Sequence, residues 1–109
     1  SIKFLEQPEF DSKEVILSFM NLIQRQDFLL SAMRGNDQQS VNVLMGETLS
    51  DPKWLDFALI YGKYEVFGIP GYLGVLSPLR TDYRRLIPLI RDVTSTITQT
   101  TRRGMIVPF

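Results

Sequence analysis

The chain has 109 residues, 44% of them hydrophobic and 11% aromatic, which is enough to form one domain with a small core. It contains no cysteine and no histidine. Disulfides, thiolate metal sites and catalysis by a cysteine nucleophile or a histidine base are therefore excluded. The 12 acidic and 12 basic residues cancel, which argues against a dedicated nucleic-acid-binding domain.

No run of apolar residues approaches the roughly 20 that a membrane-spanning helix needs. We therefore expect a single cytoplasmic domain over residues 1–109, with no membrane partner, no cofactor and no metal. Because the chain begins with Ser1 and not with methionine, we interpret it as a piece of a longer protein. Residues 1–56 carry nine acids and five bases, whereas residues 57–109 carry three acids and seven bases. The second half could therefore hold a basic patch for an anion.

The first third of the chain is expected to be mostly helical. Residues 1–11 should form an extended lead-in, and Gly35 is a natural helix stop. Between them we predict one helix over residues 12–33, or two helices with a bend near Gln26. The apolar side chains that recur at helical spacing are Ile16, Phe19, Met20, Ile23, Phe28, Leu29, Ala32 and Met33.

The middle of the chain predicts strands, because it is rich in aromatic and β-branched residues that alternate or cluster between turn signals. The last two strands should form an antiparallel hairpin, with Gly68, Pro70 and Gly71 in its turn. The predicted elements are a loop over 36–40, a strand over 41–46, a helical turn over 52–55, a strand over 57–66, a turn over 67–71 and a strand over 72–76.

The last element is predicted to be a helix that is capped by Thr81 or Asp82 and ended by Gly104. Pro88 inside it should cause a kink and not a break. The many threonines near its end are poor helix formers, so this end should fray. Its apolar stripe is Leu86, Ile90, Val93 and Ile97. The expected fold class is α+β, with an antiparallel sheet flanked by helices.

Two groups of residues invite a chemical interpretation that we do not favour. The glycine-rich segment 68–74 lacks a following helix, so it is interpreted as a turn and not as a dinucleotide-binding loop. Glu47, Asp51 and Asp56 could hold a hard cation, but their spacing matches no calcium loop. Solvated carboxylates are the favoured interpretation.

Aromatic and basic side chains give two further candidates for a binding site. Arg80, Arg84 and Arg85 lie at the start of the last predicted helix, where free backbone N–H groups could help to hold an anion. A capped helix with solvated arginines is the favoured alternative, because every helix needs caps. Three aromatic residues could stack on a ligand, but core packing is favoured for them: Trp54, Phe57 and Tyr61.

Four short segments, taken in order, are together more informative than any one of them. They are PEF at residues 8–10, VNVLMGE at 41–47, GVLSPLRTDY at 74–83 and LIPL at 86–89. In this order and spacing the chain resembles the HrcA family of heat-inducible transcription repressors. The family's pattern is not kept at Thr48, Ser77, Leu79 and Thr81, so no fine role is carried over to that last loop. The matching signature residues are Pro8, Glu9, Phe10, Gly46, Glu47, Gly74, Pro78, Arg80, Asp82 and Tyr83.

The resemblance implies the later part of a GAF-like regulatory domain, without the N-terminal winged-helix domain that binds an inverted-repeat operator of chaperone operons. It implies a dimer, since a palindromic operator is read by a two-fold protein, and a GroEL-type chaperonin as a partner. Self-association should use an exposed apolar face. The alternative is a stand-alone GAF-like sensor of a small molecule, anchored near Arg80 if the ligand is an anion. An enzyme is disfavoured, because no complete set of catalytic roles is present.

Overall fold

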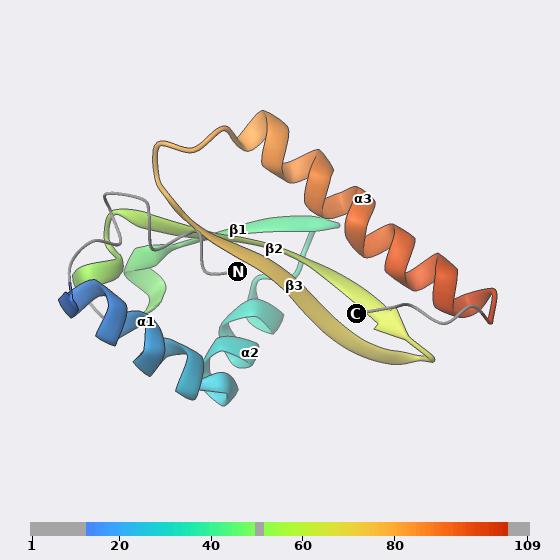
Figure 1. The fold of residues 1–109 in the computed structure, drawn as a ribbon, viewed down its shortest axis with the longest axis horizontal. Coiled ribbons are helices and arrows are strands. Elements are labelled where there is room, and N and C mark those ends of the chain that lie inside the picture. Colours follow the sequence, from blue (N-terminus) through green and yellow to red (C-terminus); the bar gives the residue numbers. More distant parts are fainter. Residues whose placement is uncertain (1–12, 50–51, 105–109) are drawn as a thin grey trace.

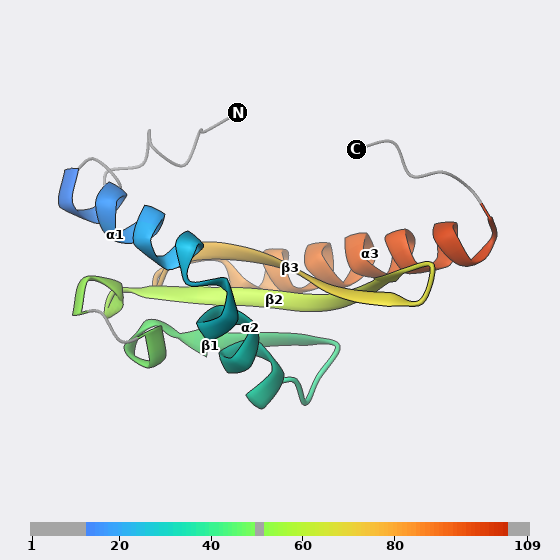
Figure 2. The ribbon, with the colours of Figure 1, turned by 90° about the horizontal axis from the view of Figure 1, so that it is seen from below.

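The computed structural model describes residues 13–49 and 52–104. An antiparallel sheet of three strands in the order β1-β2-β3 separates helices α1 and α2 on one face from helix α3 on the other (Figure 1, Figure 2). This confirms the α+β class. The elements are α1 (Lys13–Gln24), α2 (Gln26–Gly35), β1 (Val41–Met45), 3-10 helices Gly46–Leu49 and Pro52–Trp54, β2 (Phe57–Val66), β3 (Ile69–Pro78) and α3 (Tyr83–Arg102).

The two apolar clusters of the domain follow from the alternation of β2. Phe57 and Tyr61 face α1 and α2, whereas Ile60 faces α3, because successive strand side chains point to opposite faces. The larger cluster contains Leu22, Leu44, Leu49, Trp54, Phe57 and Tyr61, and the smaller one Val41, Ile60 and Ile90. The three aromatic residues considered for stacking on a ligand are thus core residues, as expected.

The first two helices confirm the two-helix form of the prediction. Arg25 has φ −96° and ψ 52°, which interrupts the helix one residue before Gln26. Its guanidinium lies 4.3 Å from the centroid of the Phe28 ring, a cation–π contact across the bend. Gly35 is the last residue of α2. The predicted lead-in, with the signature residues Pro8, Glu9 and Phe10, lies outside the described residues.

The hairpin corrects the prediction for its second strand. β2 has the predicted bounds, but β3 begins at Ile69 and ends at Pro78, and only Phe67 and Gly68 form the turn. Both turn residues have positive φ, 52° and 80°, which is the type I′ geometry that matches strand twist. The prediction was wrong because Pro70 was assigned to the turn, whereas an edge strand tolerates proline.

Helix α3 corrects two further expectations. It continues without interruption through Pro88 to Arg102, so the threonine-rich end is helical to its last turn. Val93 is 36% exposed, and Thr94 is buried in the position that the predicted stripe gave to Val93. The buried residues of α3 are Ile90, Thr94, Ile97 and Thr101. None of the helices among the described residues is long and apolar enough to cross a membrane.

Candidate functional site

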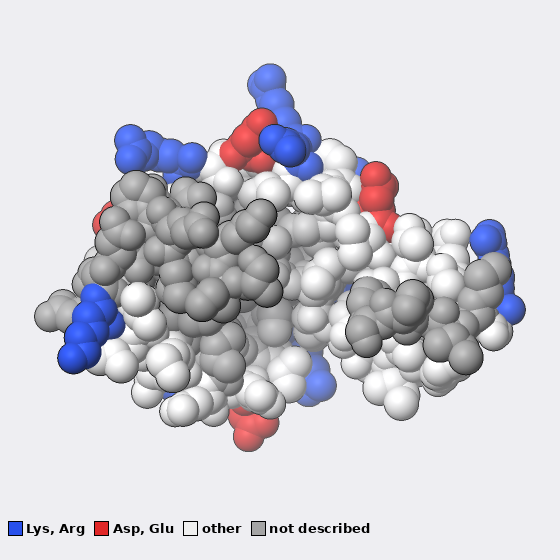
Figure 3. Space-filling model, in the orientation of Figure 1, with Lys and Arg blue, Asp and Glu red and all other residues white. Residues whose placement is uncertain are grey.

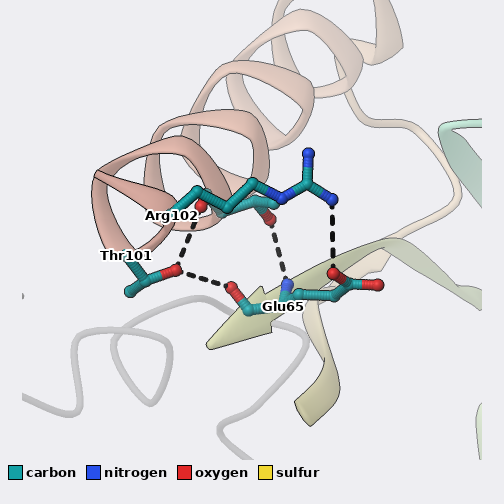
Figure 4. A network of polar contacts seen from close by, with 4 residues as sticks. Glu65, Thr101 and Arg102 are labelled. Atoms are coloured by element: carbon teal, nitrogen blue, oxygen red, sulfur yellow. Dashed lines mark hydrogen bonds and ion pairs between the residues drawn. The ribbon is translucent and has the colours of Figure 1, made fainter. Parts of the chain in front are cut away.

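The far end of β2 is held by threonines of α3. β1 pairs with β2 only as far as Gly62, so the outer backbone groups of Glu65 have no strand partner on that side. The Glu65 N–H donates to the Thr98 hydroxyl at 2.9 Å, and the Thr101 hydroxyl donates to the Glu65 carbonyl at 3.1 Å. Arg102 forms an ion pair with the Glu65 carboxylate at 3.3 Å (Figure 4). Thr98 and Thr101, which belong to the helix end that was predicted to fray, therefore bind the backbone groups of Glu65 that β1 does not reach.

The same contacts explain the proline in β3. Glu65 lies opposite Pro70, and both backbone groups of Glu65 point away from β3 toward α3. Opposed pairs in an antiparallel ladder alternate between bonded and non-bonded, so this pair exchanges no backbone hydrogen bonds. Pro70 therefore removes no bond from the hairpin.

The loop between α2 and β1 is held by the buried side chain of Asn42. Its Oδ1 accepts hydrogen bonds from the backbone N–H groups of Gln38 and Gln39, at 3.2 and 3.0 Å. Its Nδ2 donates to the Gln39 carbonyl at 2.9 Å and to Asp37 Oδ1 at 3.3 Å. The loop is thus fixed against the start of β1, and Asp37 is fixed with it.

Tyr61 and Tyr72, next to this loop, form an edge-to-face pair with ring centroids 5.6 Å apart. The Tyr61 hydroxyl donates to the Met33 carbonyl at 2.8 Å, and the Tyr72 hydroxyl donates to Asp37 Oδ2 at 3.2 Å. Burial, with a smaller contribution from the negative charge of Asp37, raises the pKa of Tyr61 to about 12. Burial and the hydrogen bond to Asp37 also raise the pKa of Tyr72. The pair is therefore a neutral, structural part of the core near pH 7.

The signature segment that follows β3 fixes the start of α3. The Leu79 N–H donates to the Asp56 carbonyl at 2.9 Å, and the Tyr83 hydroxyl donates to the Leu79 carbonyl at 2.9 Å. Asp82 occupies the N-cap position, as predicted, but its side chain makes no capping hydrogen bond. The segment therefore has a structural role as the connection between the sheet and α3.

The two signature glycines lie at close approaches of the chain. Gly46 is buried at the end of β1, and a Cβ there would overlap the carbonyl oxygen of Trp54. A Cβ on Gly74 would lie 3.1 Å from the side chain of Leu59. Pro78 ends β3. These positions are explained by packing.

The charged residues singled out from the sequence lie at the surface. Arg80, Arg84 and Arg85 are exposed. Glu47 and Asp56 are exposed as well. Asp51 lies outside the described residues, and within them no three His, Cys, Asp or Glu side chains come together as a metal site.

An apolar surface, which we call the β3 flank, runs along the open edge of the sheet. It consists of Val75 in β3 and of Leu89 and Val93 in α3, which are 37%, 53% and 36% exposed. On an α-helix each residue turns by about 100°, so Leu89 and Val93 lie on the opposite side of α3 from Arg91. Figure 1 looks at this edge, and Figure 3 shows mainly uncharged atoms between α3 and β3 where the grey residues do not cover the surface.

β3 is the last strand in the order β1-β2-β3. Among the described residues no strand pairs with its outer side. Because Glu65 and Pro70 form a non-bonded pair, the outward-facing backbone groups belong to alternate residues starting at Pro70. The outward N–H donors are therefore those of Tyr72, Gly74 and Leu76. An unpaired strand edge beside exposed apolar side chains is typical of a contact surface.

The fold is that of a GAF-like α+β domain, in which the outer side of β3 has no strand partner among the described residues. Comparison with known proteins gives its family: the model of the HrcA protein C-terminal domain matches residues 2–87, so the chain belongs to the HrcA family. The resemblance inferred from the four sequence segments is thereby confirmed.

Individual relatives agree with this assignment. The heat-inducible transcription repressor HrcA of Oceanobacillus iheyensis is 30% identical over 100 residues, which cover 91% of this chain and 29% of that protein. The repressor of the same name from Natranaerobius thermophilus is 26% identical over 95 residues, covering 86% of this chain and 27% of that protein. The chain thus spans less than a third of these relatives.

A solved crystal structure of a hypothetical protein shows the same fold. It superposes with a TM-score of 0.66 at 23% sequence identity, over 89% of this chain and 30% of that one. At this identity the likeness concerns the fold alone.

Proposed function

We propose that this chain is the regulatory and assembly region of a heat-shock transcription repressor that controls chaperone operons. The match of residues 2–87 to the HrcA C-terminal domain carries the proposal, and relatives named as heat-inducible transcription repressors support it. In this proposal residues 1–109 act as one domain, in the cytoplasm and without catalysis. Operator DNA is bound by another region of the parent protein.

The β3 flank supports self-association as the assembly role. A second copy that covers Val75, Leu89 and Val93 would remove apolar surface from water, which is the main driving force for association. Pairing along the edge of β3 would also satisfy the outward N–H groups of Tyr72, Gly74 and Leu76. We propose a dimer that forms through this flank.

The tip of the hairpin supports a chaperonin contact. Phe67 and Ile69 are 71% and 70% exposed, more than the other large hydrophobic residues described. Phe67 also adopts a left-handed backbone conformation that is costly for a residue other than glycine or asparagine. A bulky apolar side chain at this place is unfavourable for the isolated domain. Contact with a partner that has an apolar binding surface would bury it.

Light scattering over a range of protein concentrations tests the assembly role. We expect a dimer, and we expect Val93→Lys to shift the equilibrium toward monomer, because burying an unpaired ammonium is costly. Ser95→Lys is the matched control, because it adds the same charge on the opposite side of α3. A monomer at the highest concentrations would contradict self-association, and equal effects of both variants would contradict the β3 flank as its location.

A further inference from the structure

The outer side of α3 carries two rows of arginines. Arg84, Arg91 and Arg102 are seven and eleven residues apart, which is about two and three turns of an α-helix, so they lie on one line along its surface. Arg85 and Arg103 form a second line beside the first, about five turns apart. All five side chains are exposed. At a rise of about 1.5 Å per residue, the rows extend along α3 for about 27 Å.

The two rows point away from the rest of the domain. Helix α3 buries Ile90 and Ile97 against the sheet, and the arginines lie on the opposite half of the helix. No other described helix or strand lies on that outer side (Figure 1, Figure 2). Basic side chains are visible near both ends of α3 in Figure 3. We call this surface, with its five arginines, the outer face of α3.

Most of the positive charge of this face is not neutralised by other described residues. Three of the five arginines form no ion pair with them. Arg91 uses only its Nε, which donates to the Ser40 hydroxyl at 3.3 Å. Arg102 pairs with Glu65, but its side chain is 69% exposed, and exposed pairs of this kind are weak. Asp92 is the one acidic residue on the described part of this face, so basic groups prevail.

The side chains between the arginines are almost all polar. Ser95, Thr96 and Gln99 are exposed there, and Pro88 is the one apolar residue among them. A protein partner would be held mainly by apolar and aromatic anchors in the centre of its interface, which this face lacks. Guanidinium, hydroxyl and amide groups are instead the donors that contact phosphate oxygens of nucleic acids.

We propose that the outer face of α3 binds the phosphate backbone of double-stranded DNA without reading its sequence. A duplex is a linear polyanion with one charge for about 1.7 Å of its axis, so it can contact both ends of the arginine rows at once. A compact anion would reach only one or two of the arginines. The charge is segregated in the same sense, because residues 57–109 carry seven bases and three acids although the whole chain is neutral.

Backbone contacts of this kind position a protein on DNA and add affinity, whereas base contacts made elsewhere supply specificity. The inference therefore goes beyond the proposed assembly role, and its test does not depend on that role.

Fluorescence anisotropy with two labelled duplexes of unrelated sequence, titrated with the chain at several salt concentrations, tests the proposal. We expect both duplexes to bind equally. The logarithm of the association constant should fall linearly with the logarithm of the salt concentration, with a slope of about −4, as for four or five neutralised phosphates. Arg84→Gln and Arg103→Gln should each make this slope less steep by about 1. Neither substitution removes an ion pair with a described residue.

Arg34→Gln is the matched control, because Arg34 is an exposed arginine of α2, on the other face of the sheet. It should leave the affinity and the slope unchanged. A loss as large in Arg34→Gln as in Arg84→Gln would overturn the outer face of α3 as the location. Absence of binding at the lowest salt concentration, or a strong preference for one duplex, would overturn backbone binding. Tighter binding of polyglutamate than of DNA at equal charge concentration would overturn it in favour of an acidic protein.

Discussion

The backbone N–H of Glu65 donates to the hydroxyl of Thr98 at 2.9 Å, and this bond joins β2 to a helix 33 residues later in the chain. The Thr98 side chain thus binds a backbone group of β2 that β1 does not reach, because β1 pairs with β2 only as far as Gly62. Together with the contacts of Thr101 and Arg102 to Glu65, the bond fastens the end of β2 to the end of α3.

The threonines of α3 should contribute measurably to stability. Thr98→Val and Thr101→Val each remove one hydrogen bond to the Glu65 backbone and should lower the free energy of unfolding by about 1–3 kcal/mol, the cost of an unsatisfied polar group. Urea denaturation measures this change. Thr96→Val is the matched control, since Thr96 is exposed on the same helix. A loss as large for Thr96→Val would show that helix propensity and not the Glu65 contact is responsible.

Phe67→Asn should stabilise the chain while weakening its chaperonin contact. Asparagine tolerates the φ of 52°, and relief of the strain should raise the free energy of unfolding by about 1 kcal/mol. That corresponds to a rise in Tm of about 4–8 °C for a domain of this size. Phe67→Ala removes the ring without supplying a turn residue and should not give this gain. Retention of both variants by an immobilised GroEL-type chaperonin, at the level of the unchanged chain, would contradict the contact at the hairpin tip.

Stability should fall at high pH because of Tyr61. Its pKa in the folded chain is about 12, above the ordinary value of 10.0, so the unfolded chain loses this proton first. The contribution of Tyr61 is present below pH 10 and is lost as the pH rises toward 12. Tyr61→Phe should flatten the pH dependence of urea unfolding in this window. Tyr83→Phe also loses a hydrogen bond to a carbonyl but should leave the dependence in place, and an equal flattening would refute the assignment.

Gly46→Ala should be among the most damaging small substitutions. Its Cβ would overlap the Trp54 carbonyl, which belongs to the backbone and cannot rotate away. We expect a loss of about 3 kcal/mol, at the upper end of the range for overpacking. Gly35→Ala adds the same methyl group where no atom lies within 4 Å and should have little effect or a small gain. Thermal unfolding of the two variants gives the comparison, and equal melting temperatures would contradict the packing role of Gly46.

The sequence by itself determined the elements whose signals are local. The bounds of β2 and the burial of Trp54 and Tyr61 followed from periodicity and composition. For the first helices the sequence left two alternatives, one helix or two with a bend near Gln26, and the structure has two. The family followed from segments that are contiguous in the chain. Such features need no knowledge of what lies across the sheet.

Only the tertiary structure decided the features that depend on partners distant in sequence. Pro70 in a strand and the threonines in α3 are unfavourable by their local propensities. Both are accommodated at Glu65, because there β2 is no longer paired with β1 and binds α3 instead. The same packing brings Arg91 of α3 to Ser40 in the loop before β1, whereas the arginines grouped in sequence at 80, 84 and 85 are exposed. Local propensity describes a residue and its neighbours in the chain, but the pairing of strand edges and the convergence of charges depend on how the elements pack.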